Sequence, residues 1–155
     1  MAAPKPALTE IEVSRDRLAE LLNEDLSREI SGHHFVCCVL AGPEGRRVYG
    51  HCDQLEIHAK QELDHALTIS RQIDYLGKMP AVTPKPARTS EKAKDMLRFD
   101  LENENETVRN YRDRIRQCEV LGEFAMAEQI RQILMQEQDH QIDLATALRR
   151  LGKRR

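Results

Sequence analysis

Apolar residues recur along the chain at intervals of three, four and seven, and polar residues fill the positions between them. Four such stripes can be traced, one in each of the segments 10–41, 46–77, 90–120 and 123–151. This spacing predicts four amphipathic helices that pack against a shared core. The stripes consist of Leu18, Leu22, Leu26, Val36 and Leu40; Leu55, Ala59, Ala66, Ile69 and Ile73; Leu97, Leu101, Val108 and Ile115; and Ile130, Ile133, Leu134, Leu144, Leu148 and Leu151.

Glycine and proline residues gather at the breaks between these segments. The first break, 42–45, and the third, 121–122, are short, so each predicts an antiparallel helical hairpin. The second break, 77–88, contains three prolines, which favour an extended chain that can run the length of a bundle. The expected fold is all-α, an antiparallel four-helix bundle with one long crossover between the second and third helices.

Each stripe is interrupted by a glutamate where an apolar side chain is expected. Glu29, Glu62, Glu104 and Glu137 each have an apolar or aromatic residue seven positions before and seven positions after them. Burying four carboxylates together without cations would cost many kcal/mol or would force them to be protonated. A metal centre removes this contradiction.

Two of the four glutamates begin Glu-x-x-His pairs, Glu62/His65 and Glu137/His140, and this spacing puts both side chains on one helical face. The first two glutamates are 33 residues apart, and so are the last two, so each pair meets at one height of its hairpin. Inward glutamates held by arginines are the alternative, which leaves the repeated spacing to chance. The predicted catalytic metal ligands are Glu29, Glu62, His65, Glu104, Glu137 and His140, and carboxylates with imidazole suit iron or manganese.

Composition and charge exclude several classes of protein. The chain has 155 residues with a formal net charge of −2, so it has no strong field for a generic polyanion. No apolar stretch is long enough to cross a membrane, and no apolar leader precedes residue 10, so a cytoplasmic protein without a membrane partner is expected. Residues 1–9 are predicted to form a flexible segment, 10–151 the bundle and 152–155 a basic tail. The four cysteines lack a CxxC spacing and are expected to be reduced thiols.

These ligand residues and the segments around them resemble the bacterioferritin branch of the ferritin-like superfamily over about residues 18–151. The resemblance implies that Glu29 and Glu104 are terminal ligands, that Glu62 and Glu137 bridge two iron or manganese ions, and that His65 and His140 bind one ion each. It also implies a ferroxidase and a homo-oligomer, at least a dimer. It is carried by Leu21-Leu-Asn-Glu-Asp-Leu-Ser-Arg-Glu29, Glu62-Leu-Asp-His-Ala66, Ile73-Asp-Tyr-Leu-Gly77 with Pro80, Met96-Leu-Arg-Phe-Asp-Leu101 and Ile133-Leu-Met-Gln-Glu-Gln-Asp-His140.

The sequence departs from the family pattern at three places. Leu63 stands where bacterioferritins have a haem-binding methionine, so haem is not expected. Val36 and Ile69 replace tyrosines near the metal site. Tyr111 is a candidate to serve instead as a hydrogen-bonding or radical residue, with simple packing in the core as the favoured alternative. No fifth helix follows before Arg155, which leaves a dimer, a smaller cage and an altered cage open.

Other polar residues are candidates for supporting roles. His58 and His33 lie one turn from ligand glutamates and could act beside the metal site, with a polar core or surface position as the alternative. Gln61, Gln136 and Asp143 could orient the ring nitrogens of the ligand histidines.

Two charged runs are read as surface features. In the acidic run of Asp100, Glu102, Glu104 and Glu106, only Glu104 is expected to face inward. The basic residues of 149–155 complement a helix C-terminus, so nucleic acid is not expected as a partner.

The expected function is oxidation of Fe(II) by O2 or H2O2 for iron storage or detoxification. Two alternatives remain open: a di-iron or di-manganese oxidase or peroxidase without storage, and a non-enzymatic helical scaffold, including one associated with DNA.

Overall fold

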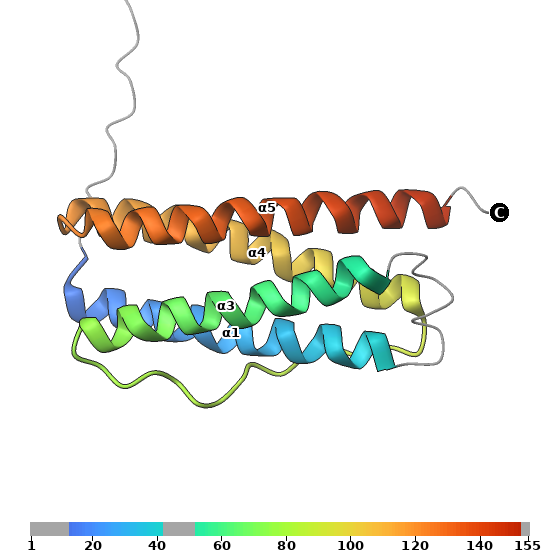
Figure 1. Cartoon of the computed structure of the whole chain (residues 1–155), viewed down its shortest axis with the longest axis horizontal. Helices are drawn as coiled ribbons and strands as arrows, with labels where there is room; N and C mark the ends of the chain where they lie inside the picture. The colour runs from blue at the N-terminus through green and yellow to red at the C-terminus, as the bar shows by residue number, and fades with distance from the viewer. Residues whose placement is uncertain (1–12, 42–51, 153–155) are drawn as a thin grey trace, which may run out of the picture.

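The computed structural model describes residues 13–41 and 52–152, and this part of the chain consists of four long helices and the segments between them. The helices are α1 (Arg15–Ala41), α3 (Cys52–Tyr75), α4 (Ala93–Val120) and α5 (Phe124–Gly152) (Figure 1). Their bounds follow the four predicted segments, and the described residues contain no strand, so the all-α prediction is confirmed. None of these helices is both long and apolar enough to span a membrane.

The helices pair as two hairpins. α1 packs chiefly against α3, and α4 against α5, and the two pairs lie against each other to form the bundle (Figure 1). Gly122 ends α4 with a φ of +77°, a conformation that glycine adopts without steric cost. The Glu123 N–H then donates to the Cys118 carbonyl at 2.8 Å, which closes the turn into α5. The predicted first break at 42–45 lies outside the described residues.

The long crossover runs back along the outside of α1 (Figure 1). The Ala81 N–H donates to the Asn23 side-chain oxygen at 2.6 Å. Further along, the Lys85 N–H donates to the Ser27 carbonyl at 3.1 Å, and the Ser31 hydroxyl donates to the Lys85 carbonyl at 2.7 Å. Because the prolines of this segment lack an N–H, it depends on these contacts with α1 for its position. The predicted crossover is confirmed.

The apolar core is divided into two clusters. One fills the end of the bundle where α1 begins, and it includes Leu22, Ile69, Tyr111 and Ile130. The other fills the opposite end and contains Phe35, Leu55, Ala59, Met96, Leu97 and Leu144. In each helix the glutamate of the stripe lies between the residues of the two clusters, so one polar layer separates two apolar ends.

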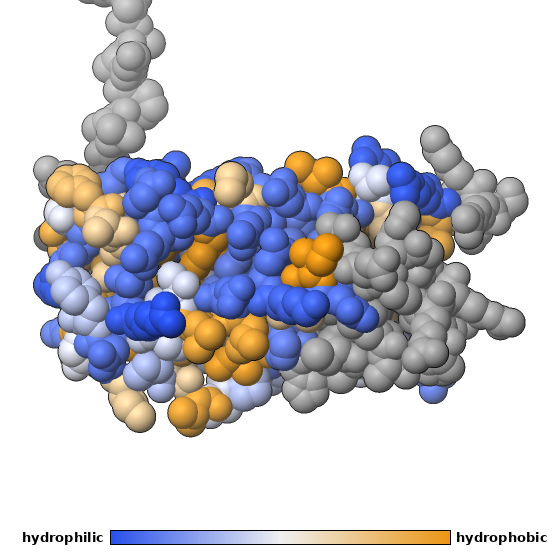
Figure 2. Space-filling model, viewed as in Figure 1, coloured by the Kyte–Doolittle hydropathy of each residue, from blue (hydrophilic) through white to orange (hydrophobic). Residues whose placement is uncertain are grey.

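The outer face of α3 and α5 is mainly polar. Figure 2 shows separate apolar areas on this otherwise hydrophilic face. Leu63 and Leu67 are about half exposed, at 49% and 48%, and stand one turn apart on α3. The predicted domain limits remain predictions, since residues 1–9 and 153–155 lie outside the described part of the chain.

Candidate metal centre

All six predicted ligands meet in the polar layer. Each of the six residues is at most 7% exposed, and each of the four helices contributes at least one of them. Their ligand atoms form two groups, and within each group the atoms lie within 4.8 Å of one another. One group is Glu29, Glu62, His65 and Glu137, and the other is Glu62, Glu104, Glu137 and His140. The two groups therefore share two carboxylates and have one histidine each.

His65 points one ring nitrogen at the carboxylates and the other away from them. Its Nδ1 lies 3.2 Å from Glu29 Oε2 and 2.7 Å from Glu137 Oε1. Its Nε2 lies 2.6 Å from Gln136 Oε1. Because an amide oxygen can only accept, Nε2 carries a proton, and Nδ1 is the nitrogen that can offer a lone pair to a metal.

His140 repeats this arrangement in the other hairpin. Its Nδ1 lies 3.5 to 3.7 Å from oxygens of Glu62, Glu104 and Glu137, and its Nε2 donates to Gln61 Oε1 at 2.8 Å. The prediction that Gln61 and Gln136 orient the two rings is therefore confirmed.

The centre contains buried polar atoms that have no hydrogen-bond partner. They are Glu104 Oε2, both carboxylate oxygens of Glu137, and His140 Nδ1. Buried polar atoms are nearly always paired in folded proteins, so four in one place point to an additional partner. Each group offers three carboxylates and one imidazole, which is a donor set that fits iron or manganese.

Comparison with known proteins agrees with this geometry. The family described as the ferritin-like domain matches residues 19–154. The chain belongs to the ferritin-like family. No match was found among curated proteins. The predicted resemblance is thus confirmed, and the all-α bundle is the expected ferritin-like fold.

Two solved structures resemble this ferritin-like chain closely. A ferritin-like, diiron-carboxylate protein from Bacillus anthracis str. Ames has a TM-score of 0.80 and 25% identity, with 89% of this chain and 99% of that chain covered. A bacterioferritin from Rhodobacter capsulatus, solved with a metal-free dinuclear site and haem iron, has a TM-score of 0.80 and 20% identity, with coverage of 89% and 87%. At 20% identity, the second likeness shows the fold alone.

The electrostatics of this ferritin-like centre reflect four buried carboxylates beside two imidazoles. Burial, together with the neighbouring carboxylates, raises the pKa of Glu62 and Glu104 well above the usual range. Burial lowers the pKa of the two histidines, but their contacts with the carboxylates outweigh it and bring the pKa of His65 to about 10 and of His140 to about 9. The same contacts overcome burial and lower the pKa of Glu137. A metal that binds here must displace protons.

The contacts around Glu29 were only partly foreseen. Tyr111 is fully buried and its hydroxyl donates to Glu29 Oε1, so it makes the hydrogen bond that was the less favoured of the two alternatives for this residue. The buried Arg114 donates from Nε to Asp25 Oδ2 at 2.6 Å, and Arg28 lies 3.2 Å from the other oxygen of Asp25. This charged pair joins α4 to α1 one turn from Glu29. Sequence analysis missed it, although Asp25 lies four residues before Glu29 and so shares its face.

The remaining candidates have different surroundings. The His58 ring stacks on the His140 ring with a centroid distance of 4.0 Å, and its Nε2 lies 3.3 Å from Asp143 Oδ2. His58 therefore adjoins a ligand, whereas Asp143 contacts His58. His33 Nδ1 lies 2.7 Å from the Ala59 carbonyl and so contacts the backbone of α3.

One expectation about the acidic run was wrong. Asp100 was expected to be solvated, but it is only 6% exposed. It lies four residues before Glu104 on α4 and therefore shares the inward face. Burial raises the pKa of its carboxyl to about 7. The helical spacing could have revealed this position.

Proposed function

We propose that this ferritin-like protein is a ferroxidase that binds two Fe(II) ions per chain and oxidises them with O2 or H2O2. The observation that carries the proposal is the pair of buried ligand groups that share Glu62 and Glu137. Two metal positions with common carboxylates suit a reaction that collects one electron from each of two ions. The diiron-carboxylate description of the Bacillus anthracis neighbour supports the same assignment.

We assign the residues by the group to which they belong. Glu29 and His65 would hold one ion, Glu104 and His140 the other, and Glu62 and Glu137 would bridge both. Bound together, two Fe(II) ions supply two electrons: with two protons, these convert O2 to H2O2, or H2O2 to two molecules of water.

Other side chains of the chain prepare this site. The side-chain oxygens of Gln61 and Gln136 hold the two imidazoles with Nδ1 toward the carboxylates. Tyr111 fixes the orientation of Glu29 through its hydroxyl. The apolar clusters on both sides of the polar layer restrict water, which strengthens the attraction between carboxylates and cations.

A titration of the metal-free protein with Fe(II) in air tests the proposal. Near-ultraviolet absorbance should report rapid oxidation of about two Fe(II) ions per chain, one for each ligand group. Glu62→Ala and Glu137→Ala should lose the rapid phase and keep their helical circular dichroism. Glu102→Gln is the matched control, because Glu102 lies on the solvent side of α4 and pairs with Arg88. Full rates in both alanine variants would overturn the assignment.

We further propose that the chain acts in iron storage or detoxification as a homo-oligomer. The half-exposed Leu63 and Leu67 on α3 offer apolar surface that a second copy could cover. Soluble uptake of iron far beyond two ions per chain, with a closed shell by size exclusion, would support storage. Uptake that stops at two, followed by precipitation, would indicate an oxidase or peroxidase that lacks a shell.

A further inference from the structure

The two ligand histidines are held differently on the side that faces the carboxylates. His65 Nδ1 lies 2.7 Å from Glu137 Oε1 and 3.2 Å from Glu29 Oε2, within hydrogen-bonding distance of both. His140 Nδ1 lies 3.5 to 3.7 Å from the oxygens of three carboxylates and has no hydrogen-bond partner. Contacts with carboxylates therefore fix the ring of His65 but leave Nδ1 of His140 unattached.

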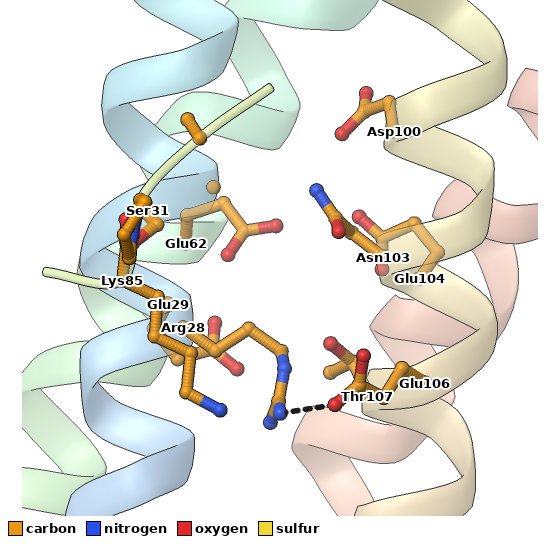
Figure 3. Close-up of a pocket in the computed structure, with 13 residues that line it drawn as sticks. Arg28, Glu29, Ser31, Glu62, Lys85, Asp100, Asn103, Glu104, Glu106 and Thr107 are labelled. Carbon is orange, nitrogen blue, oxygen red and sulfur yellow. Dashed lines mark hydrogen bonds and ion pairs between the residues drawn. The ribbon is translucent and has the colours of Figure 1, made fainter.

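Two of the carboxylates beside His140 border free space. Glu62 and Glu104 line a cavity of about 190 Å³, and Figure 3 shows their side chains on opposite sides of this space. Packing on this side cannot fix the His140 ring. The χ2 torsion of a histidine has a broad, roughly two-fold energy profile, so a ring without contacts on its face turns readily. The orientation of His140 must therefore be set from its other sides.

The ring of His58 covers one face of His140. His58 lies on α3 and is only 4% exposed, and the centroids of the two stacked rings are 4.0 Å apart with 26° between their planes. The centroid of the His65 ring is further from that of His140, at 6.2 Å. Because stacked flat rings attract each other, and because a His140 ring that turned about χ2 would collide with His58, the stack restrains this ligand.

His58 is itself anchored to α5. Its Nε2 lies 3.3 Å from Asp143 Oδ2, and because a carboxylate accepts hydrogen bonds, this nitrogen carries the proton. Asp143 follows His140 by three residues, so both side chains that contact His58 lie on one face of α5. On α3, Gln61 follows His58 by three residues and accepts from His140 Nε2 at 2.8 Å. One turn of α3 therefore holds the His140 ring both by its face and by its outer nitrogen.

We propose that His58 is a positioning residue for the metal position of Glu104 and His140: its ring, anchored by Asp143, holds the His140 imidazole with Nδ1 toward the carboxylates before a cation arrives. The inference rests on the proposed function, because it takes His140 as a ligand of one of the two ions. A ligand that is already oriented loses little freedom when the cation binds. Removal of the stack should therefore weaken binding at this position and spare the position of Glu29 and His65.

Binding of Co(II), followed by its visible absorption, tests this role without relying on turnover. The two positions can be measured separately, because the His65→Ala protein keeps an intact His140 position and the His140→Ala protein keeps an intact His65 position. Added to His65→Ala, His58→Leu should lower the Co(II) affinity of the remaining position about tenfold. Added to His140→Ala, it should have no effect. A residue that only supports the fold would weaken binding in both proteins.

Further substitutions test which contact restrains the ligand. His58→Phe keeps a flat ring against His140 and loses the hydrogen bond to Asp143, so it should recover most of the affinity that His58→Leu loses. Asp143→Ala removes the anchor; because this side chain is 43% exposed, the fold should persist, and the loss should be smaller than in His58→Leu. Phe99→Leu is the matched control, since the Phe99 ring stacks on Arg88 instead, and it should leave Co(II) affinity unchanged.

The outcomes separate this role from the proposed function. An unchanged affinity in His58→Leu or in Asp143→Ala, or equal weakening of both positions, would refute the positioning role and leave the ferroxidase intact. An equal loss in His58→Phe and His58→Leu would refute it too, because stacking would then not restrain the ligand. In a metal-free crystal of His58→Leu the His140 ring should adopt more than one orientation, and a single unchanged orientation would contradict the role. Absence of Co(II) from both positions of the wild type would refute the proposed function itself.

Discussion

Glu29 and Glu104 occupy equivalent positions in the two hairpins, but their surroundings differ. Glu29 accepts a hydrogen bond from Tyr111 and lies one turn from the buried pair of Asp25 and Arg114. Glu104 has an oxygen without a hydrogen-bond partner and, like Glu29, lines a cavity that Asp100 also lines. The sequence repeat thus produces two similar sets of ligands, but only Glu29 accepts a hydrogen bond from a buried tyrosine, whereas Glu104 keeps an unpaired oxygen.

The histidines differ in the opposite sense. Each has a glutamine on its Nε2, and the His140 ring centroid lies 4.0 Å from that of His58 and 6.2 Å from that of His65.

The largest expected effect on Fe(II) oxidation comes from substituting a carboxylate that both ligand groups share. Glu137→Gln should reduce Fe(II) oxidation to the rate of the uncatalysed reaction, because it removes a ligand from both groups. His65→Ala and His140→Ala should each weaken one Co(II) position and spare the other, as followed by the visible absorption of Co(II). If Glu137→Gln impaired only one position, the shared role of Glu137 would be excluded.

Next in size is the effect of pH on the metal-free protein. The pKa values of Glu62, Glu104, His65 and His140 are all raised by folding. A raised pKa means that the folded state holds a proton more firmly, so its contribution to stability is complete below the unfolded pKa and is lost as the pH rises through the folded value. Folding lowers the pKa of His58 to about 4, which acts in the opposite direction below about pH 6.5, so the window to measure lies above it. Unfolding in the presence of a chelator should therefore occur at lower temperature as the pH rises from about 7 to 9.

Bound Co(II) should reverse this fall in unfolding temperature with rising pH. Each proton that binding displaces makes the apparent affinity for Co(II) rise about tenfold per pH unit until the ligand is deprotonated. The Co(II)-loaded protein should then gain thermal stability over the pH range in which the metal-free protein loses it. Parallel melting curves would contradict the assignment of these six residues as ligands.

A smaller effect, about 3–5 kcal/mol, is expected from breaking the pair that braces the Glu29 half. Arg114→Met leaves the Asp25 carboxylate buried without its main partner, and urea unfolding of the metal-free protein should show the loss. Arg116→Met is the control: its partner Asp113 is 58% exposed, and removing that exposed pair should cost no more than about 1 kcal/mol. Equal losses in the two variants would show that burial of the first pair is unimportant.

Much of the centre could be predicted because it depends on regular geometry. The stripes place Glu29, Glu62, Glu104 and Glu137 at one level, and the repeated spacing of 33 residues brings them together whatever the details of packing. The four helices and the crossover follow from the same periodicity and from the prolines. These features require only helix rise, helix period and chain direction.

The features that could not be predicted depend on how the helices are rotated about their axes relative to one another and on contacts between segments far apart in the sequence. The pairing of Asp25 with Arg114 spans 89 residues and needs the relative rotation of α1 and α4. The cavity beside Asp100 exists because the crossover is fixed to α1 through Lys85, a contact that no local pattern specifies. Asp100 itself is different, since its position four residues before Glu104 already placed it on the inward face.

The substitution with the smallest expected effect is Tyr111→Phe, and it tests the difference between the two ligand groups most directly. Tyr111→Phe removes one hydroxyl and leaves the ring in the core, so the fold should persist. Loss of its hydrogen bond frees Glu29 to rotate, and Co(II) affinity at the Glu29 and His65 position should fall about tenfold, as is typical when the partner of a ligand is removed. The position of Glu104 and His140 should keep its affinity, because Tyr111 makes no hydrogen bond there. Equal weakening of both positions would mean that the two halves are coupled through the shared carboxylates, and that the bracing of Glu29 serves the whole centre.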